Sequence, residues 1–300
     1  MVRSGLLLLG SLGLVVACAA LSYSTPSTPA PAAGQRRTKT TSGSVFLDSD
    51  ARQATSVATL KKPSACPPEM SLVQGACIDR YEAHLLLQQQ SDGSLTLHPP
   101  HARPTQGKFV AAARAGVKPQ AYISQIEAAG ACSNAGKRLC SVVEWYGACT
   151  GSEKTTYPYG ARLEAGRCNS GKPHLLSRLH GTNPLAWQYV HFNDPELAKQ
   201  PGFLSLTGEY AGCAGPNGVY DLVGNLHEWV ADRVDRALAK KLPVAAVIQR
   251  RIGRTIGNGI FMGGFFSTQN EHGPGCTYVT AAHERGYHDY STGFRCCRDR

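Results

Sequence analysis

The sequence predicts a loop-rich α+β domain stabilised by disulfide bonds, and three observations support this class. Glycine and proline, 32 and 18 in 300 residues, recur so often that only short strands fit between them. Two segments have the start and stop signals of helices, and ten of the 11 cysteines follow Cys18. We therefore expect one large domain with little regular secondary structure.

The N-terminal end predicts export. Arg3 precedes an apolar run, residues 6–17, that is too short to span a bilayer comfortably, so residues 1–18 are expected to be a signal peptide. The segment Val15-Val16-Ala17-Cys18 resembles a bacterial lipobox, which would place a lipid on Cys18, and ordinary cleavage near Ala19 is the alternative. Either way we expect an exported protein: a lipoprotein of the bacterial cell envelope that contacts the membrane only through its lipid, or a periplasmic or secreted protein.

A linker is expected between this end and the folded part. Residues 19–65 are rich in Ser, Thr, Pro and Ala and contain few large apolar residues, which is typical of a disordered spacer. The domain is therefore expected to cover residues 66–300 and to begin near Cys66-Pro67-Pro68.

Two capping boxes predict the helices. Ser124 opens the first helix, with Gly136 as its expected C-cap, and Ser141 opens the second, which Gly151 should end. The apolar residues at helical spacing are Ile126, Ala129 and Cys132 in the first helix, and Val142, Trp145, Tyr146 and Cys149, expected to face the core, in the second.

The charge of the chain argues against nucleic acid as a partner. The formal charge is +10, but only 17% of the residues are charged, and the basic runs are pairs such as Arg36-Arg37 and Arg250-Arg251. The sequence has no nucleic-acid-binding motif and no array of aromatic residues among the basic ones. We expect a solvated basic surface.

The cysteines after Cys18 are expected to form disulfide bonds. An even number in an oxidising compartment favours disulfides, and no C-x₂-C pairs recur at the spacing of a zinc site. Spacing alone leaves their pairing open. They are Cys66, Cys77, Cys132, Cys140, Cys149, Cys168, Cys213, Cys276, Cys296 and Cys297.

The most informative segment is residues 218–229, Gly-Val-Tyr-Asp-Leu-Val-Gly-Asn-Leu-His-Glu-Trp. Asp221, Asn225 and Glu228 provide side-chain oxygens, and a bend at Gly224 would free backbone carbonyls. Such hard oxygen ligands are those that Ca²⁺ prefers. The alternative is a buried turn whose polar groups bond to the backbone.

This segment resembles the G-[LV]-Y-[DN]-x-x-G-N-x-x-E-W signature of the formylglycine-generating-enzyme (sulfatase-modifying-factor) family. Three further segments resemble the family's motifs in the same order, so the resemblance covers roughly residues 66–299. It implies a fold related to C-type lectin-like domains. The further segments are Met70-Ser71-Leu72-Val73 leading to Ile78-Asp79-Arg80-Tyr81-Glu82, Ala135-Gly136-Lys137-Arg138-Leu139 with Glu144-Trp145, and Gly263-Gly264 with Gly293-Phe294-Arg295-Cys296.

The resemblance also implies structural calcium. The family's ligand positions correspond here to Asp221, Gly224, Asn225, Leu226 (through its carbonyl) and Glu228. A second family site would use Asn169 and the carbonyl of Ser170, but its remaining ligands have no clear counterpart.

The family's catalytic residues are not matched. Active members hold Cu(I) with two thiols in a C-x₄-C arrangement after the Gly-Gly pair, because the soft ion needs soft ligands. Here Ser267 stands at the first thiol position, and no cysteine appears until Cys276. We therefore expect no bound copper and assign no catalytic residue.

Family cross-links imply the pairs Cys132–Cys296 and Cys149–Cys276. Proximity and exclusion then suggest Cys66–Cys77, Cys168–Cys213 and Cys140–Cys297, which would leave no free thiol. The family's substrate groove lies in the C-terminal segment, which contains His272, His283 and His288. Their spacing matches no metal-binding helix face, so exposed loop histidines are expected. His227 is expected to pack, and Glu271 and Glu284 would serve acid–base chemistry only if buried beside a partner.

The sequence thus predicts an exported domain of this fold without copper-dependent oxidase activity. Its expected role is a cell-envelope binding or accessory module for a peptide, protein or glycan. The alternative is an oxidoreductase of the same family that oxidises a cysteine or another group on a protein or peptide.

Overall fold

A computed structural model describes residues 66–241 and 255–300, except residue 270. The expected signal peptide, lipobox and linker lie outside these residues. Among the described helices, none has both the length and the hydrophobicity needed to cross a bilayer.

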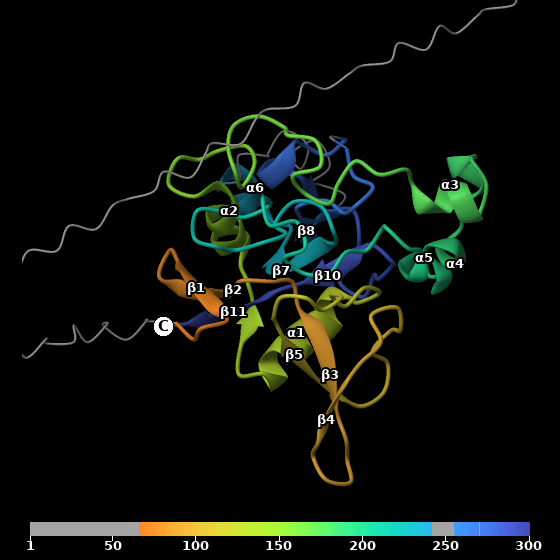
Figure 1. The fold of residues 1–300 in the computed structure, drawn as a ribbon, viewed down its shortest axis with the longest axis horizontal. Coiled ribbons are helices and arrows are strands. Elements are labelled where there is room, and N and C mark those ends of the chain that lie inside the picture. Colours follow the sequence, from red (N-terminus) through yellow and green to blue (C-terminus); the bar gives the residue numbers. More distant parts are fainter. Residues whose placement is uncertain (1–65, 242–254, 270) are drawn as a thin grey trace, which may run out of the picture. The chain divides into compact units, whose positions relative to one another are not determined.

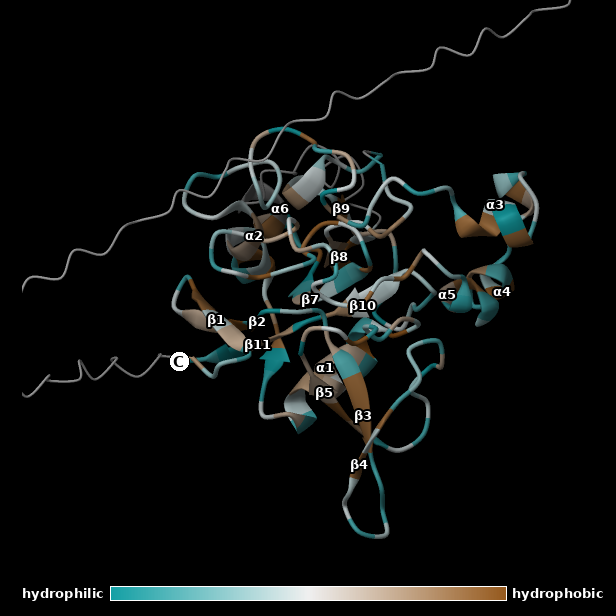
Figure 2. Ribbon diagram, viewed as in Figure 1, coloured by the Kyte–Doolittle hydropathy of each residue, from teal (hydrophilic) through white to brown (hydrophobic). Residues whose placement is uncertain are grey.

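Three small sheets form the β part of the domain (Figure 1). The first has the order β1-β2-β11-β6 and the second the order β10-β7-β8-β9. The third has the order β4-β3-β5, and β3 is coloured as hydrophobic over most of its length (Figure 2). The strands are β1 Met70–Val73, β2 Ala76–Asp79, β3 His84–Gln88, β4 Leu95–Leu97, β5 Lys108–Ala112, β6 Arg138–Leu139, β7 His227–Arg233, β8 Gly259–Met262, β9 Val279–Thr280, β10 Thr292–Phe294 and β11 Cys296–Asp299.

The C-terminal strands connect two of these sheets. β11 lies between β2 and β6, with Cys297 opposite Ile78 and Arg138, while β10, two residues earlier, pairs in parallel with β7. The last nine residues therefore join the N-terminal hairpin to the segment that contains Glu228. This connection brings together motifs that are more than 200 residues apart in the chain.

The first predicted helix is α1, Gln125–Asn134, which Ser124 and Glu127 cap as expected. Ala135 caps its end, and Gly136 follows with a φ of +68°. Its buried face differs from the expected one, because Ile126 is 54% exposed and Gln125 is buried instead. The Gln125 amide donates to the carbonyls of Val230 and Asp232 and accepts a hydrogen bond from Arg285, so a polar residue occupies the core-facing position.

The second predicted helix is α2, Val142–Thr150, which Ser141 and Glu144 cap. Val142, Trp145 and Cys149 are fully buried, whereas Tyr146 is only partly buried. Gly151 ends the helix with a φ of +61°, and a Cβ at this position would lie 2.6 Å from the Pro216 ring.

A group of short helices between residues 174 and 200 was not predicted. They are α3 Leu175–Leu179, the 3₁₀ helix η1 Pro184–Ala186, α4 Tyr189–Phe192 and α5 Glu196–Lys199. Figure 1 shows α3, α4 and α5 together at one side of the described domain. Leu175, Leu176 and Leu197 bury their side chains in a cluster with Phe266 and Tyr290. Two more short helices are α6 Arg236–Lys241 and η2 Gly275–Thr277.

Five disulfide bonds hold the loops, and they join the same pairs that the sequence suggested. Four of them connect segments at least 45 residues apart, so they restrict the unfolded chain more than local bridges do. The pairs are Cys66–Cys77, Cys132–Cys296, Cys140–Cys297, Cys149–Cys276 and Cys168–Cys213.

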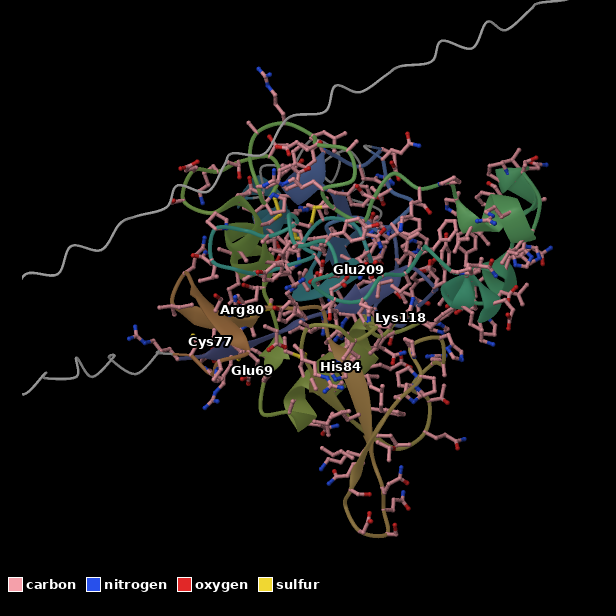
Figure 3. The ribbon with its side chains drawn as sticks, viewed as in Figure 1. Glu69, Cys77, Arg80, His84, Lys118 and Glu209 are labelled. Carbon is pink, nitrogen blue, oxygen red and sulfur yellow. A yellow bond between two sulfur atoms is a disulfide. The ribbon has the colours of Figure 1, made fainter. Side chains whose placement is uncertain are left out.

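Because His84, at the start of β3 (Figure 3), is buried, we predict that the domain loses stability in acid. Burial, assisted by the charge of Arg114, lowers the pKa of His84 from 6.5 to about 4. The neutral imidazole is favoured in the folded state, so this contribution to stability is present above pH 6.5 and is lost as the pH falls towards 4. We expect the free energy of unfolding to fall by about 2 kcal/mol between pH 7 and pH 5 for this reason.

Urea denaturation of the variant His84→Leu at both pH values measures this contribution. The variant should lose that part of the pH dependence, whereas His101→Leu, at a half-buried loop position, should retain it. An unchanged pH dependence in His84→Leu contradicts the prediction.

Candidate functional site

A fully buried ion pair lies where the motif segments meet. The Arg295 guanidinium donates from Nε to Glu228 Oε2 at 2.6 Å and from Nη2 to Glu228 Oε1 at 2.6 Å. Two further hydrogen bonds, from Nη1 and Nη2, go to the carbonyls of Asp79 and Tyr220. Both side chains are at most 1% exposed, so the pair is shielded from water and from salt.

Residues of the other motifs complete this network. Trp145 Nε1 donates to Glu228 Oε2 at 2.9 Å, and Lys137 Nζ lies 2.6 Å from Asp79 Oδ1. The Glu82 carboxylate accepts hydrogen bonds from the Asn225 side-chain amide and from the backbone amide of Leu226. All four motif segments therefore meet in one buried polar network.

The acidic groups of the network exceed the basic ones, and the pKa values respond to this. Burial raises the pKa of Glu82 well above its usual value, and the negative charges of Asp221 and Glu228 raise it further. Burial likewise raises the pKa of Asp221 to about 6. A higher pKa favours the protonated form, which reduces the excess of buried negative charge.

The Asp221–Asn225 segment turns sharply to enter this network. Asp221 and Asn225 have φ angles of +61° and +53°, and Gly224 has one of +81°. A Cβ on Gly224 would lie 2.1 Å from the Asn169 carbonyl oxygen, so only glycine fits there. The Gly224 amide donates to the Gly263 carbonyl, which brings the Gly-Gly pair against this turn.

At the first expected calcium set, the positive charge comes from the Arg295 side chain of the protein itself. Both Glu228 oxygens accept from Arg295, and Asn225 Oδ1 already accepts from Asn169, the Ser205 amide and the Ser205 hydroxyl. Within the described residues, no group of three or more His, Cys, Asp and Glu side chains is placed to hold a metal ion. A calcium ion bound through Glu228 would have to displace the guanidinium, so this arrangement does not fit it.

The second expected set lies beside the first. The Asn225 amide donates to the Asn169 carbonyl at 2.8 Å, and Asn169 Nδ2 donates to Asn225 Oδ1 at 2.8 Å. Asn169 Oδ1 is buried and has no hydrogen-bond partner in the described chain, so it is one oxygen that a cation could use. The Ser170 amide donates to the Cys168 carbonyl. The Lys172 ammonium already donates to the carbonyls of Gly202 and Phe203 nearby.

The two residues nearest the family's thiol positions do not form a thiol site. Cys276 is bonded to Cys149, and each of the ten cysteines within the described residues is in a disulfide. The Ser267 hydroxyl donates to the Pro173 carbonyl at 3.0 Å. Its neighbour Thr268, rather than Ser267, lines a small cavity of about 180 Å³.

A larger cavity, which we term the aromatic cavity, has a volume of about 440 Å³. It lies between the second sheet, the loop before β10 and the helix α4. Of the 14 described residues that line it, eleven have aromatic or imidazole rings. They are His174, Tyr189, Phe192, His227, Phe261, Phe265, His272, Tyr278, His283, Tyr287 and Tyr290, and the others are Thr280, Asp289 and Ser291.

The three expected loop histidines have a different setting from the one predicted. His272 and His283 are partly buried and line the aromatic cavity together with His227, which packs as expected against Phe261, Phe265 and Tyr278. His288 is also partly buried, so the expectation of exposure was wrong for all three. Glu271 and Glu284 are exposed and do not meet the condition of burial set for acid–base chemistry.

Sequence reasoning missed His174, Tyr189 and Phe192, which form one wall of the aromatic cavity. They belong to the helices between residues 174 and 200, and no motif or spacing in the sequence connects them with the C-terminal loops. His174 stacks on Trp187, with 4.8 Å between the ring centroids. Tertiary contacts bring this wall into place: Tyr290 and Phe265 contact His174, and Tyr189 contacts Tyr287.

A family profile described as the sulfatase-modifying factor enzyme 1-like domain matches residues 73–300. The chain therefore belongs to this family. No match was found among curated proteins.

The solved structures similar to this chain include PvdO from Pseudomonas aeruginosa, with 13% identity and a TM-score of 0.43 over 75% of this chain and 80% of that one. The Major Tropism Determinant I1 variant has 16% identity and a TM-score of 0.42 over 79% of this chain. The alignment spans only 54% of that protein's length. CarF has 16% identity and a TM-score of 0.31, over 73% of this chain and 59% of its own.

Breaking the buried ion pair should destabilise the domain strongly. The variant Arg295→Met leaves Glu228 buried without its cation, and we expect a loss of about 3–5 kcal/mol in the free energy of unfolding. Adding Glu228→Gln to this variant should recover part of the loss. In the matched control Arg138→Met, whose side chain is 39% exposed in its pair with Glu144, the loss should be below about 1 kcal/mol. Equal losses in urea denaturation would contradict the buried role.

Binding of calcium at Asp221 and its neighbours stays a prediction of the resemblance. A titration distinguishes it from the alternative, in which Arg295 provides the positive charge at this place. Calorimetry of EDTA-treated protein with CaCl₂, with MgCl₂ as control, measures binding, and the Tm measures its effect on stability. Saturable heat with a rising Tm is the outcome that the resemblance predicts. A flat titration with constant Tm is the outcome that the Arg295–Glu228 pair predicts, and the geometry favours this second outcome.

Proposed function

We propose that this protein is an exported binding module that holds its ligand in the aromatic cavity and has no copper-dependent oxidase activity. The observation that carries the proposal is a ring-lined cavity of about 440 Å³ in a domain whose ten described cysteines are all in disulfides. This volume lies in the usual range for small-ligand sites, about 300–1,000 Å³. The predicted ligand is a peptide, protein or glycan group, and nucleic acid is not among the expected partners.

Export is the part of the proposal that the disulfides support. Five bridges are typical of proteins in an oxidising compartment such as the periplasm, the cell surface or the extracellular space. A lipid on Cys18 would hold the domain in the bacterial cell envelope, and residues 19–65 would act as its tether. The proposal also includes the expected relationship of the fold to C-type lectin-like domains.

The lack of a free thiol pair among the described cysteines supports the absence of copper chemistry. A hydroxyl does not replace a thiolate toward Cu(I), and the bond to Cys149 withdraws Cys276 from metal binding. The alternative, an oxidoreductase of the same family, would need a ligand set for its metal or cofactor outside these two positions.

Oxygen consumption and mass spectrometry of a cysteine-containing peptide, with and without added Cu(I), test the proposal. We expect rates equal to those of the copper-only control, and no free thiol in native protein treated with a thiol reagent. Robust turnover that depends on the protein would overturn the proposal and favour the oxidoreductase.

Binding is tested with peptide and glycan arrays. The variant His283→Trp introduces a larger ring into the aromatic cavity and should abolish the signal of the wild-type protein. His101→Trp, outside the cavity, should leave it unchanged. Equal signals from both variants would show that the ligand binds elsewhere.

A further inference from the structure

We propose that the aromatic cavity recognises a methylated ammonium group, carried by a small molecule or by a peptide side chain. This inference rests on the proposed binding function and names the chemical class of its ligand. Three features of the cavity lead to it: the ring faces, the single formal charge and a polar atom without a partner.

The first feature is the density of ring faces. Tyr189 and Tyr287 have their centroids 5.5 Å apart, and Phe265 and Tyr290 have theirs 5.7 Å apart. These rings come from α4, the loop after β8 and the loop before β10, so they approach the cavity from different directions. The negative faces of aromatic rings attract a cation, and the attraction is stronger when water is excluded.

The second feature is the charge of the lining. Among the lining residues that the structure describes, Asp289, which is 4% exposed, is the one acidic residue, and none is a lysine or arginine. Its carboxylate accepts hydrogen bonds from the Ser291 amide, the Ser291 hydroxyl and the Tyr287 hydroxyl. These donors are neutral, so they satisfy the oxygens without cancelling the negative charge.

The charge of Asp289 acts across the cavity. Burial lowers the pKa of His174 and that of His283, and the charge of Asp289 opposes the shift in both. Burial also lowers the pKa of His227 well below its usual value. These three imidazoles therefore favour their neutral forms, and the lining presents one negative charge among neutral rings. An organic cation complements this lining, whereas a phosphate or carboxylate would be repelled.

The third feature is His227 Nδ1, which is buried and has no hydrogen-bond partner among the residues described. His227 is only 5% exposed and lines the cavity. An unpaired buried polar atom is unfavourable, so a ligand that supplies a hydrogen bond here would gain affinity. A ligand with a polar group close to its ammonium group would satisfy this atom if the group reached it. Methylation matters because a methylated ammonium is less costly to desolvate than a primary one.

The test compares choline with its uncharged isostere 3,3-dimethylbutanol in calorimetric titrations of the full-length protein. We expect choline to bind at least about tenfold more tightly, a difference of about 1.4 kcal/mol. A peptide with trimethyl-lysine, compared with the same peptide with unmodified lysine, distinguishes a side-chain ligand from a free small molecule. Preference for the peptide identifies a protein ligand, and preference for choline a small molecule.

Two pairs of variants connect this binding to the proposed residues. Tyr189 is half exposed on α4, so its substitution is tolerated by the fold. Tyr189→Phe keeps the ring face and should change choline affinity less than twofold, whereas Tyr189→Leu should weaken it about two- to fivefold. Asp289→Asn should weaken choline about tenfold and leave the isostere unchanged. The exposed control Glu153→Gln should change neither.

Equal affinity for choline and its isostere, or no binding of either choline or the methylated peptide, would overturn the inference. If Asp289→Asn does not fold, the Tyr189 pair alone decides. If an uncharged ligand binds on the arrays and His283→Trp abolishes that binding, the proposed function holds and this inference fails. Copper-dependent turnover together with choline binding would overturn the proposed function, while this inference would hold.

Discussion

The ion pair between Arg295 and Glu228 is the interaction on which the arrangement of this domain depends. It is fully buried, and both oxygens of Glu228 accept hydrogen bonds from the same guanidinium. Because an unpaired charge in this environment would be very costly, the segment before β11 can occupy only a position that brings Arg295 to β7. The two strands on either side of Arg295 then belong to different sheets, which the pair holds together.

The same constraint explains why the motifs of the sequence occur in segments so far apart. Within one network, Lys137 donates to Asp79, and Trp145 donates to Glu228. The Asp79 carbonyl accepts a hydrogen bond from Arg295. These contacts all satisfy buried polar groups, so the motif residues serve the architecture of the fold. The motifs therefore identify the family and the architecture, while they leave the ligand open.

The aromatic cavity has a different origin. Its walls come from β7, β8 and β9, from the loops around them and from α4, and most of their residues lie outside the motifs. The disulfides Cys149–Cys276 and Cys132–Cys296 fix the ends of the C-terminal loop region that contains Tyr287 and Asp289. A framework of buried charges and disulfides thus supports a ring-lined cavity built largely on loops, where the sequence can change without disturbing the core.

The sequence by itself determined the family, the two capped helices and the α+β class. These features depend on local signals, such as Ser124 with Glu127, or on motifs whose order is visible in the chain. The five disulfide pairs also agree with those expected, although spacing alone would have left them open. The tertiary structure alone decided that Gln125 is buried, that His272 and His283 line a cavity and that Arg295 neutralises Glu228. Each of these depends on contacts between segments far apart in the chain, and such contacts follow from packing and desolvation, which no local pattern records.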